Sequence, residues 1–233
     1  MIVKPSIMVE DFRKSAGGVT ASKNKSRLYV KNRITPRNPR TESQTQVRSD
    51  LTTNSRAWSQ LTQAQRDAWN EYAKSVLGRR QLGAAAKISG FNAYMRIANN
   101  LAVINLPALT MPPSSVEFPV YEISNVVYVA PVGETPGTLT ISFAGLTTLT
   151  GMHMIVKATA PFSGGRASLP SALRVITNNA SVATGSTEVL ASYNAKFGAF
   201  ASAGQKVEIQ VYLIDDATGL ASLKQSFVYL QSA

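Results

Sequence analysis

Apolar residues recur at helical spacing in three stretches between residues 41 and 106. Thr41 and Gln44 have the spacing of a capping box, in which two side chains satisfy the exposed backbone amides at the start of a helix. Thr62 and Gln65 repeat that spacing. The apolar residues of the first predicted helix form a stripe along one of its faces. The predicted helices span 42–60, 62–77 and 90–104, and the stripe of the first contains Val47, Leu51, Ser55 and Trp58.

Aromatic residues lie on the apolar stripes of all three predicted helices. An indole buries a large apolar area when it is placed inside, so we predict that both tryptophans pack in one small helical core. A stacking platform for nucleic-acid bases is the alternative interpretation of the two indoles. The predicted helical core contains Trp58, Trp69, Tyr72, Phe91 and Tyr94.

The period changes to two beyond a proline-rich stretch at 107–120. Alternating apolar residues with turn residues between short segments are typical of an antiparallel sandwich. We predict a β-sandwich of the immunoglobulin or fibronectin type III kind over 121–233. The clearest alternation lies in 206–213, with Val207, Ile209, Val211 and Leu213 facing inward. The predicted strands span 122–130, 138–143, 152–160, 173–177, 187–191, 206–215 and 222–230.

The first forty residues keep neither period for long, because glycines and prolines interrupt them. Residues 27–33 could form one strand with Leu28 and Val30 on one side, and 34–40 reads as an extended, polyproline-like piece. The chain is therefore predicted to be an α+β multidomain protein. Its predicted parts are an extended basic arm (1–40), a small three-helix domain (41–106), a proline-rich linker (107–120) and the sandwich (121–233).

The distribution of charged residues also separates the first hundred residues from the rest of the chain. Positions 1–100 hold 18 Lys and Arg against 6 Asp and Glu, whereas positions 101–233 hold 6 against 7. Clustered cations repel one another unless a polyanion or an acidic surface lies nearby, so the imbalance predicts a partner. A segment this polar cannot offset its conformational entropy alone, and we expect neighbouring chains to order it. The predicted contact residues of the arm are Lys23, Lys25, Arg27, Tyr29, Lys31, Arg33, Arg37 and Arg40.

Candidate chemistry is sparse, and we expect neither an enzyme nor a cofactor or metal site. The chain has no Cys, which excludes disulfides and thiolate sites. His153 is the only histidine, and we predict a solvent-facing strand position for it rather than a catalytic one. Asp215 and Asp216 are predicted to form a turn, since a Ca²⁺ site needs more oxygen ligands than their surroundings supply.

Neither a secretory signal nor a membrane-spanning run is apparent. Charged residues and Pro5 break the first fourteen positions, and no stretch approaches the ~18 to 20 apolar residues that a transmembrane helix requires. We therefore expect a soluble product made in the cytoplasm, with no membrane partner.

Four stretches carry a resemblance to a family of largely uncharacterised proteins encoded in tailed-bacteriophage and prophage genomes. They are 22–33 (SKNKSRLYVKNR), 35–41 (TPRNPRT), 55–58 (SRAW) and 61–70 (LTQAQRDAWN), followed by Gly90-Phe-Asn. The resemblance covers the first hundred residues well and the β half only loosely. It implies a virion structural protein, whether capsid-associated, at the head–tail connector or in a tail ring. Its partners would be other virion proteins, copies of itself and, by non-specific contact, packaged DNA, with no small-molecule substrate.

Two other functions remain open at this point. A sequence-independent DNA-binding or packaging protein would use the same cations for backbone contacts, since the third helix offers too few cations for a recognition helix. A carbohydrate-binding adhesion protein would use the loops of the sandwich. A steep loss of DNA affinity with salt would favour the first, and glycan binding by 121–233 the second.

Overall fold

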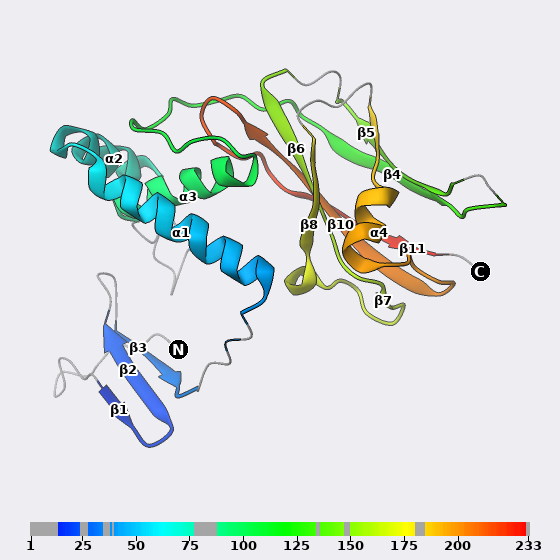
Figure 1. The fold of residues 1–233 in the computed structure, drawn as a ribbon, viewed down its shortest axis with the longest axis horizontal. Helices are drawn as coiled ribbons and strands as arrows, with labels where there is room; N and C mark the ends of the chain where they lie inside the picture. Colours follow the sequence, from blue (N-terminus) through cyan, green and yellow to red (C-terminus); the bar gives the residue numbers. More distant parts are fainter. Residues whose placement is uncertain are drawn as a thin grey trace. The chain divides into compact units, whose positions relative to one another are not determined.

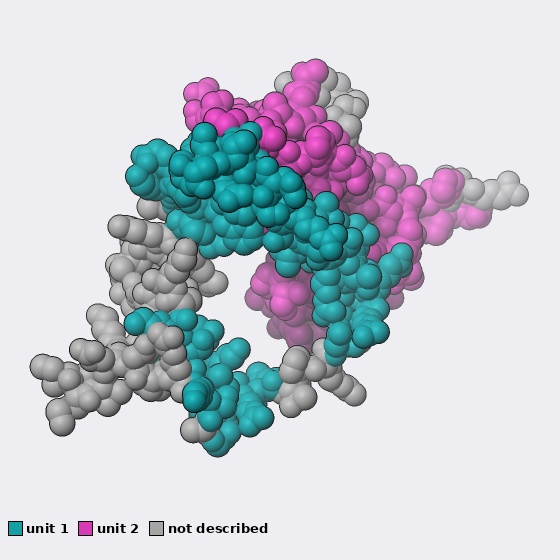
Figure 2. Space-filling view, turned by 60° about the vertical axis from the view of Figure 1, so that its left-hand side comes forward, with its two compact units in different colours: residues 1–94 teal, residues 95–233 magenta. Residues whose placement is uncertain are grey.

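The computed structural model describes residues 14–23, 28–34, 38, 40–76, 88–133, 136–146, 150–179 and 185–231. Within them the protein is α+β, with four α-helices and antiparallel strand pairs in every sheet (Figure 1). The chain divides into two units, 1–94 and 95–233 (Figure 2). The division falls inside the third helix.

The first unit begins with a three-stranded antiparallel sheet, in the order β1-β2-β3. Its strands are β1 (Lys14–Ala16), β2 (Val19–Lys23) and β3 (Leu28–Asn32). We predicted one strand here within an extended arm, and β3 matches it, but residues 14–23 form two further strands. The turn between them is made by Gly17 and Gly18, with Gly17 at a φ of 55° that favours glycine. This segment is therefore folded on itself and is not an extended arm.

The predicted helices are confirmed as α1 (Glu42–Gln60), α2 (Gln63–Ser75) and α3 (Gly90–Val103). Local chemistry explains where the first two begin. The Thr62 hydroxyl accepts from the Gln65 backbone N–H at 3.3 Å, and the Thr62 N–H donates to Gln65 Oε1 at 2.8 Å. Thr41 caps α1 by accepting from the Gln44 N–H. These caps satisfy amides that the first turn of a helix leaves without partners.

The five predicted core aromatics are brought together in the first unit. The Tyr94 ring lies 5.2 Å from the Trp58 ring and 5.3 Å from the Trp69 ring, measured between centroids. Phe91 packs edge-on against Trp58, and Tyr72 against Trp69. Trp69 and Tyr94 are fully buried, while the other three are half-buried. Edge-to-face contacts of this kind stabilise a core beyond the area they bury.

Gly90 allows α3 to begin against α2. A Cβ at this position would lie 2.7 Å from the Asn70 backbone nitrogen and 2.9 Å from the Trp69 carbonyl carbon. Any larger residue would force the two helices apart. The Gly-Phe-Asn sequence at the start of α3 therefore has a packing explanation.

The second unit contains two antiparallel sheets. One has the strand order β4-β5-β9, and the other has the order β11-β10-β6-β8 with β7 also paired to β10. Residues 107–120 contain no helix or strand and belong to the second unit, where Phe118 packs against the hydrophobic core. The strands are β4 (Glu122–Val129), β5 (Thr138–Ala144), β6 (Met152–Ala158), β7 (Phe162–Ser163), β8 (Arg174–Asn179), β9 (Ser186–Glu188), β10 (Gln205–Asp215) and β11 (Gln225–Leu230), with a 3₁₀ turn at Pro170–Ala172.

Side chains from both sheets fill one hydrophobic core. The predicted inward residues of β10 are all fully buried, so the alternation in the sequence identified the core face correctly. Opposite them lie buried residues of the other sheet. Central members of the core are Val207, Ile209, Val211, Leu213, Leu139 and Ile141.

A fourth helix, α4 (Leu190–Phe197), replaces the second half of the strand predicted at 187–191. The carboxylate of Glu188 accepts from the backbone N–H groups of Leu139 and Leu190, at 3.2 and 2.7 Å, and so caps the helix start. The buried Tyr193 hydroxyl donates to the Thr159 carbonyl at 2.9 Å. Burial raises the pKa of Tyr193 far above its usual value, which keeps this donor protonated. Tertiary contacts therefore favour a helix over the predicted strand in this segment.

Candidate functional site

The N-terminal sheet has one polar, cationic face. Thr20 pairs with Lys31 and Ser22 with Tyr29 across β2 and β3, and the Ser15 and Thr20 hydroxyls lie 2.8 Å apart. Cross-strand partners point to the same side of a sheet, and alternate residues of one strand do too. Pairing continues past β3, because the Arg33 N–H donates to the Gly18 carbonyl at 2.7 Å. We call this surface the polar face; it consists of Ser15, Thr20, Ser22, Tyr29, Lys31 and Arg33.

The opposite face of the same sheet is apolar. Ala21 and Leu28 are buried, and Val30, which pairs with Ala21, is half-buried. Val19 on this side is 40% exposed. The sheet therefore has a hydrophobic side, which also carries the exposed Lys14 and Lys23, and a polar side that presents Lys31 and Arg33, both exposed. Sequence alternation predicted Leu28 and Val30 on one side, and the structure agrees.

The structure brings together only part of the predicted contact set. Tyr29, Lys31 and Arg33 share the polar face, whereas Lys23 pairs with Leu28 and belongs to the other side. Arg40 is exposed just before the cap of α1, with a φ of 50°. The remaining predicted residues, Lys25, Arg27 and Arg37, lie outside the described residues.

The stretch of sequence that forms the polar face carries only positive charge. Residues 12–41 contain nine Lys or Arg and no Asp or Glu. No carboxylate from this stretch can therefore neutralise the polar face. An acidic surface or a polyanion fits it electrostatically.

Helix α1 adds an exposed apolar stripe, which consists of Val47 and Leu51. These side chains are 66% and 50% exposed, and they precede Asn54 and Trp58 at the 4-3-4 spacing of one helix face. Asn54 is buried and Trp58 packs on Phe91 and Tyr94. We predicted a single core-facing stripe through Ser55, but only its second half faces the core, and Asn54 takes the place of Ser55. Spacing alone could not show where that core ends.

The predicted turn at Asp215 and Asp216 is confirmed. The Asp215 carboxylate accepts from the Thr218 N–H at 2.9 Å and from its hydroxyl at 2.6 Å, and the Gly219 N–H donates to the Asp215 carbonyl at 2.8 Å. A Cβ at Gly219 would lie 2.7 Å from Leu101 Cγ, so this turn needs glycine. Across the described ranges, no group of three or more His, Cys, Asp or Glu could hold a metal ion.

His153 does not face solvent as predicted. Its Nδ1 lies 2.5 Å from Asp216 Oδ1, and the two side chains are 18% and 31% exposed. The pair links β6 to the turn that follows β10. Sequence could not reveal it because the partners are 63 residues apart. The pair is a contact between two segments of the fold that lie far apart in the sequence.

None of the helices among the described residues is long and apolar enough to cross a bilayer. The helices instead bury one face and expose the other.

Comparison with known proteins gives little. No protein-family model matches the chain, and no curated protein matches it. One similar solved structure is catalytically inactive OgpA from Akkermansia muciniphila in complex with an O-glycopeptide substrate, with a TM-score of 0.29 and 11% sequence identity. The match covers 64% of this chain and 38% of that one. A likeness this weak does not define the fold or the function.

Proposed function

We propose that the protein is a non-enzymatic structural component of a tailed-bacteriophage virion, capsid-associated or in a head–tail neck or tail ring. In this proposal it acts by joining neighbouring subunits through its N-terminal unit. The observation that carries the proposal is the polar face, where Tyr29, Lys31 and Arg33 alternate along one edge strand without any nearby acid in the sequence. The phage setting and the virion location rest on the resemblance of the first hundred residues.

In this proposal the β half is a folded domain that supports the N-terminal unit. We propose that residues 121–233 form a sandwich of the immunoglobulin or fibronectin type III kind. The support is that two antiparallel sheets contribute to a single core. Such a module is stable by itself, and so it leaves the N-terminal unit free to make contacts with other chains.

Two kinds of contact would combine at the interface. Exposed cations guide association and set its salt dependence, but they contribute little affinity individually. Apolar area supplies most of the binding free energy, at roughly 25 cal/mol per Å² buried. Val47 and Leu51 of the exposed stripe, with Tyr29 on the polar face, are the groups that offer such area. We therefore expect partners with an acidic surface next to an apolar one.

A charge-removal variant tests the proposal. Lys31→Gln together with Arg33→Gln should reduce recovery of the chain in purified particles by more than about threefold, because many copies multiply a small loss per contact. Lys196→Gln, an exposed lysine on α4, is the matched control and should enter particles normally. Quantitative immunoblotting of particles measures both. Equal recovery of the double variant and the control would contradict the proposal.

Sequence-independent DNA binding is the second candidate, and the same cations favour it. Lys and Arg that contact phosphates release counterions, so affinity falls steeply as salt rises. Fluorescence anisotropy with a mixed-sequence duplex at ~50 and ~200 mM salt distinguishes the two functions. A steep loss that disappears in the Lys31→Gln, Arg33→Gln variant would favour DNA binding. No binding at ~50 mM salt would leave the assembly role as the better explanation.

A further inference from the structure

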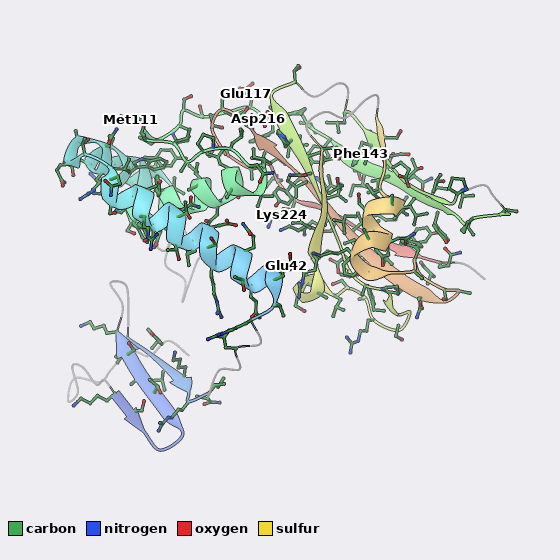
Figure 3. All side chains as sticks on the ribbon, viewed as in Figure 1. Glu42, Met111, Glu117, Phe143, Asp216 and Lys224 are labelled. Carbon is green, nitrogen blue, oxygen red and sulfur yellow. The ribbon has the colours of Figure 1, made fainter. Side chains whose placement is uncertain are left out.

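Two lysines converge on one tyrosine on the five-stranded sheet of the second unit. Lys157 Nζ lies 5.0 Å from the centroid of the Tyr212 ring, and Lys224 Nζ lies 5.4 Å from it. Tyr212 is in β10, Lys157 is in the neighbouring strand β6, and Lys224 comes directly before β11, which pairs with the other edge of β10. Lys224 is labelled in Figure 3. Three separate segments therefore place two ammonium groups around one ring.

Strand pairing fixes this arrangement. Tyr212 pairs with Ile155, and Lys157 follows two residues later on the same face. Val211 pairs with Gln225, so the preceding residue, Lys224, lies beside Tyr212. The lysines come from the strand regions on either side of β10, and their convergence is a property of the sheet rather than of a loop.

Among the residues that the structure describes, neither ammonium group forms an ion pair with a carboxylate. The ion pairs found among the described residues are Lys74–Glu71 and His153–Asp216. Glu208 is buried four residues before Tyr212 in β10, and its carboxylate already accepts from the Leu169 N–H. The two positive charges thus lie near the same ring, and no ion pair among the described residues neutralises either of them.

The pair is electrostatically unfavourable without a ligand. Burial, and then the charge of Lys224, lower the pKa of Lys157 below its ordinary value. Tyr212 is only 5% exposed. Its ring attracts the two cations through the electrons of its face but is not accessible to a ligand. A bound anion would relieve the repulsion and the loss of hydration together.

Neutral hydrogen-bonding groups border the two lysines. Gln210 pairs with Lys157 in β6 and with Ser226 in β11. Its Nε2 donates to the Ser226 hydroxyl oxygen at 3.1 Å, which leaves the hydroxyl hydrogen of this exposed serine available to a ligand. The surface therefore offers two cations and a hydroxyl donor.

We propose that Lys157 and Lys224, held over Tyr212, form a binding site for a dianionic tetrahedral oxyanion, a phosphate group. Two ammonium groups match two negative charges, and lysine binds phosphate as a point charge without strict orientation. This lysine-pair site lies in the second unit and does not depend on the assembly role. The phosphate group can be free or carried as a monoester on a larger molecule.

Titration of the full chain with inorganic phosphate, at pH 7.5 and constant ionic strength, tests the proposal. We expect saturable shifts of the side-chain resonances of Lys157 and Lys224 by NMR, and none at Lys196. Glycerol 3-phosphate is the second probe. Stronger binding of glycerol 3-phosphate than of inorganic phosphate would identify a monoester as the source of the group, and stronger binding of inorganic phosphate would identify the free ion. Both results support the site.

Three variants separate binding from packing. Lys157→Met and Lys224→Met keep the aliphatic cover of Tyr212 but remove one charge each, and each should weaken phosphate binding about tenfold. Lys196→Met removes the same charge elsewhere and should leave the affinity within about twofold. Near-ultraviolet circular dichroism checks that the variants are folded. The phosphate affinity of the Lys157→Met, Lys224→Met double variant is then measured.

Three results would overturn the proposal. One is the absence of saturable shifts at both lysines with either probe. Another is unchanged affinity in the folded Lys157→Met, Lys224→Met double variant, because the lysines would then serve only to cover the ring. Binding of a short DNA duplex without binding of either phosphate probe would also overturn it, since it would indicate a general polyelectrolyte surface.

Discussion

The two ends of the chain both contain antiparallel sheets, but they satisfy different requirements. In β10 the residues that point to both faces are buried, including Ile209 and Leu213 on one side and Tyr212 and Ile214 on the other. In the N-terminal sheet, Ala21 and Leu28 are the buried hydrophobics among the residues whose burial is described. A small sheet needs a substantial apolar face to be stable in water. The comparison teaches that the second unit carries its own core, whereas the N-terminal sheet buries few side chains, and in the proposed assembly we expect partners to add to its stability.

The largest expected effect lies in the shared core of the second unit. Ile209→Ala should lower its free energy of unfolding by roughly 2–5 kcal/mol, because the deletion leaves a cavity between two sheets. Urea denaturation measures the change. Val129→Ala, at a position 52% exposed in β4, is the control and should stay within about 0.5 kcal/mol. If the two variants had equal effects, the second unit would have no independent core.

A smaller effect is expected at the start of α2. Thr62→Ala removes the hydroxyl half of the capping box and should cost about 1 kcal/mol of stability in the helical region. Thr52→Ala makes the same chemical change inside α1, where the hydroxyl bonds only to the Arg48 carbonyl, and serves as the control. Thermal unfolding followed by tryptophan fluorescence reports both. A greater loss from Thr52→Ala would show that the cap does not determine where α2 begins.

The smallest expected effect is in the N-terminal sheet. Leu28→Ala removes one of its two buried hydrophobic side chains, yet the main urea transition should move by less than about 0.5 kcal/mol. The reason is that we expect this small sheet to open locally without unfolding the cooperative cores. A loss as large as that of Ile209→Ala would place the sheet within the cooperative structure and remove the difference between the two ends.

Elements with a strong local signal were predictable from the sequence. The capping residues located α1 and α2, and the alternation of Val207 to Leu213 identified the inner face of β10. Both signals depend on neighbours in the chain. They therefore survive without any knowledge of tertiary contacts.

Other features depend on distant residues and were missed. Strands β1 and β2 are only three and five residues long, and the alternation in β2 rests on just Val19 and Ala21, although Gly17-Gly18 interrupts the pattern at their turn. Helix α4 depends on tertiary hydrogen bonds of Glu188 and Tyr193. Of the candidate site, Tyr29 and Lys31 were foreseen as contact residues, but their common face required the pairing of β2 with β3.

Hydrogen exchange of the backbone amides tests most directly whether the N-terminal sheet depends on other chains. In a dilute solution of the isolated protein, we expect the amides of Val19–Lys23 and Leu28–Asn32 to exchange far faster than those of Gln205–Asp215. In assembled particles the first two segments should become protected. Equal protection of all three segments in the isolated protein would contradict the account.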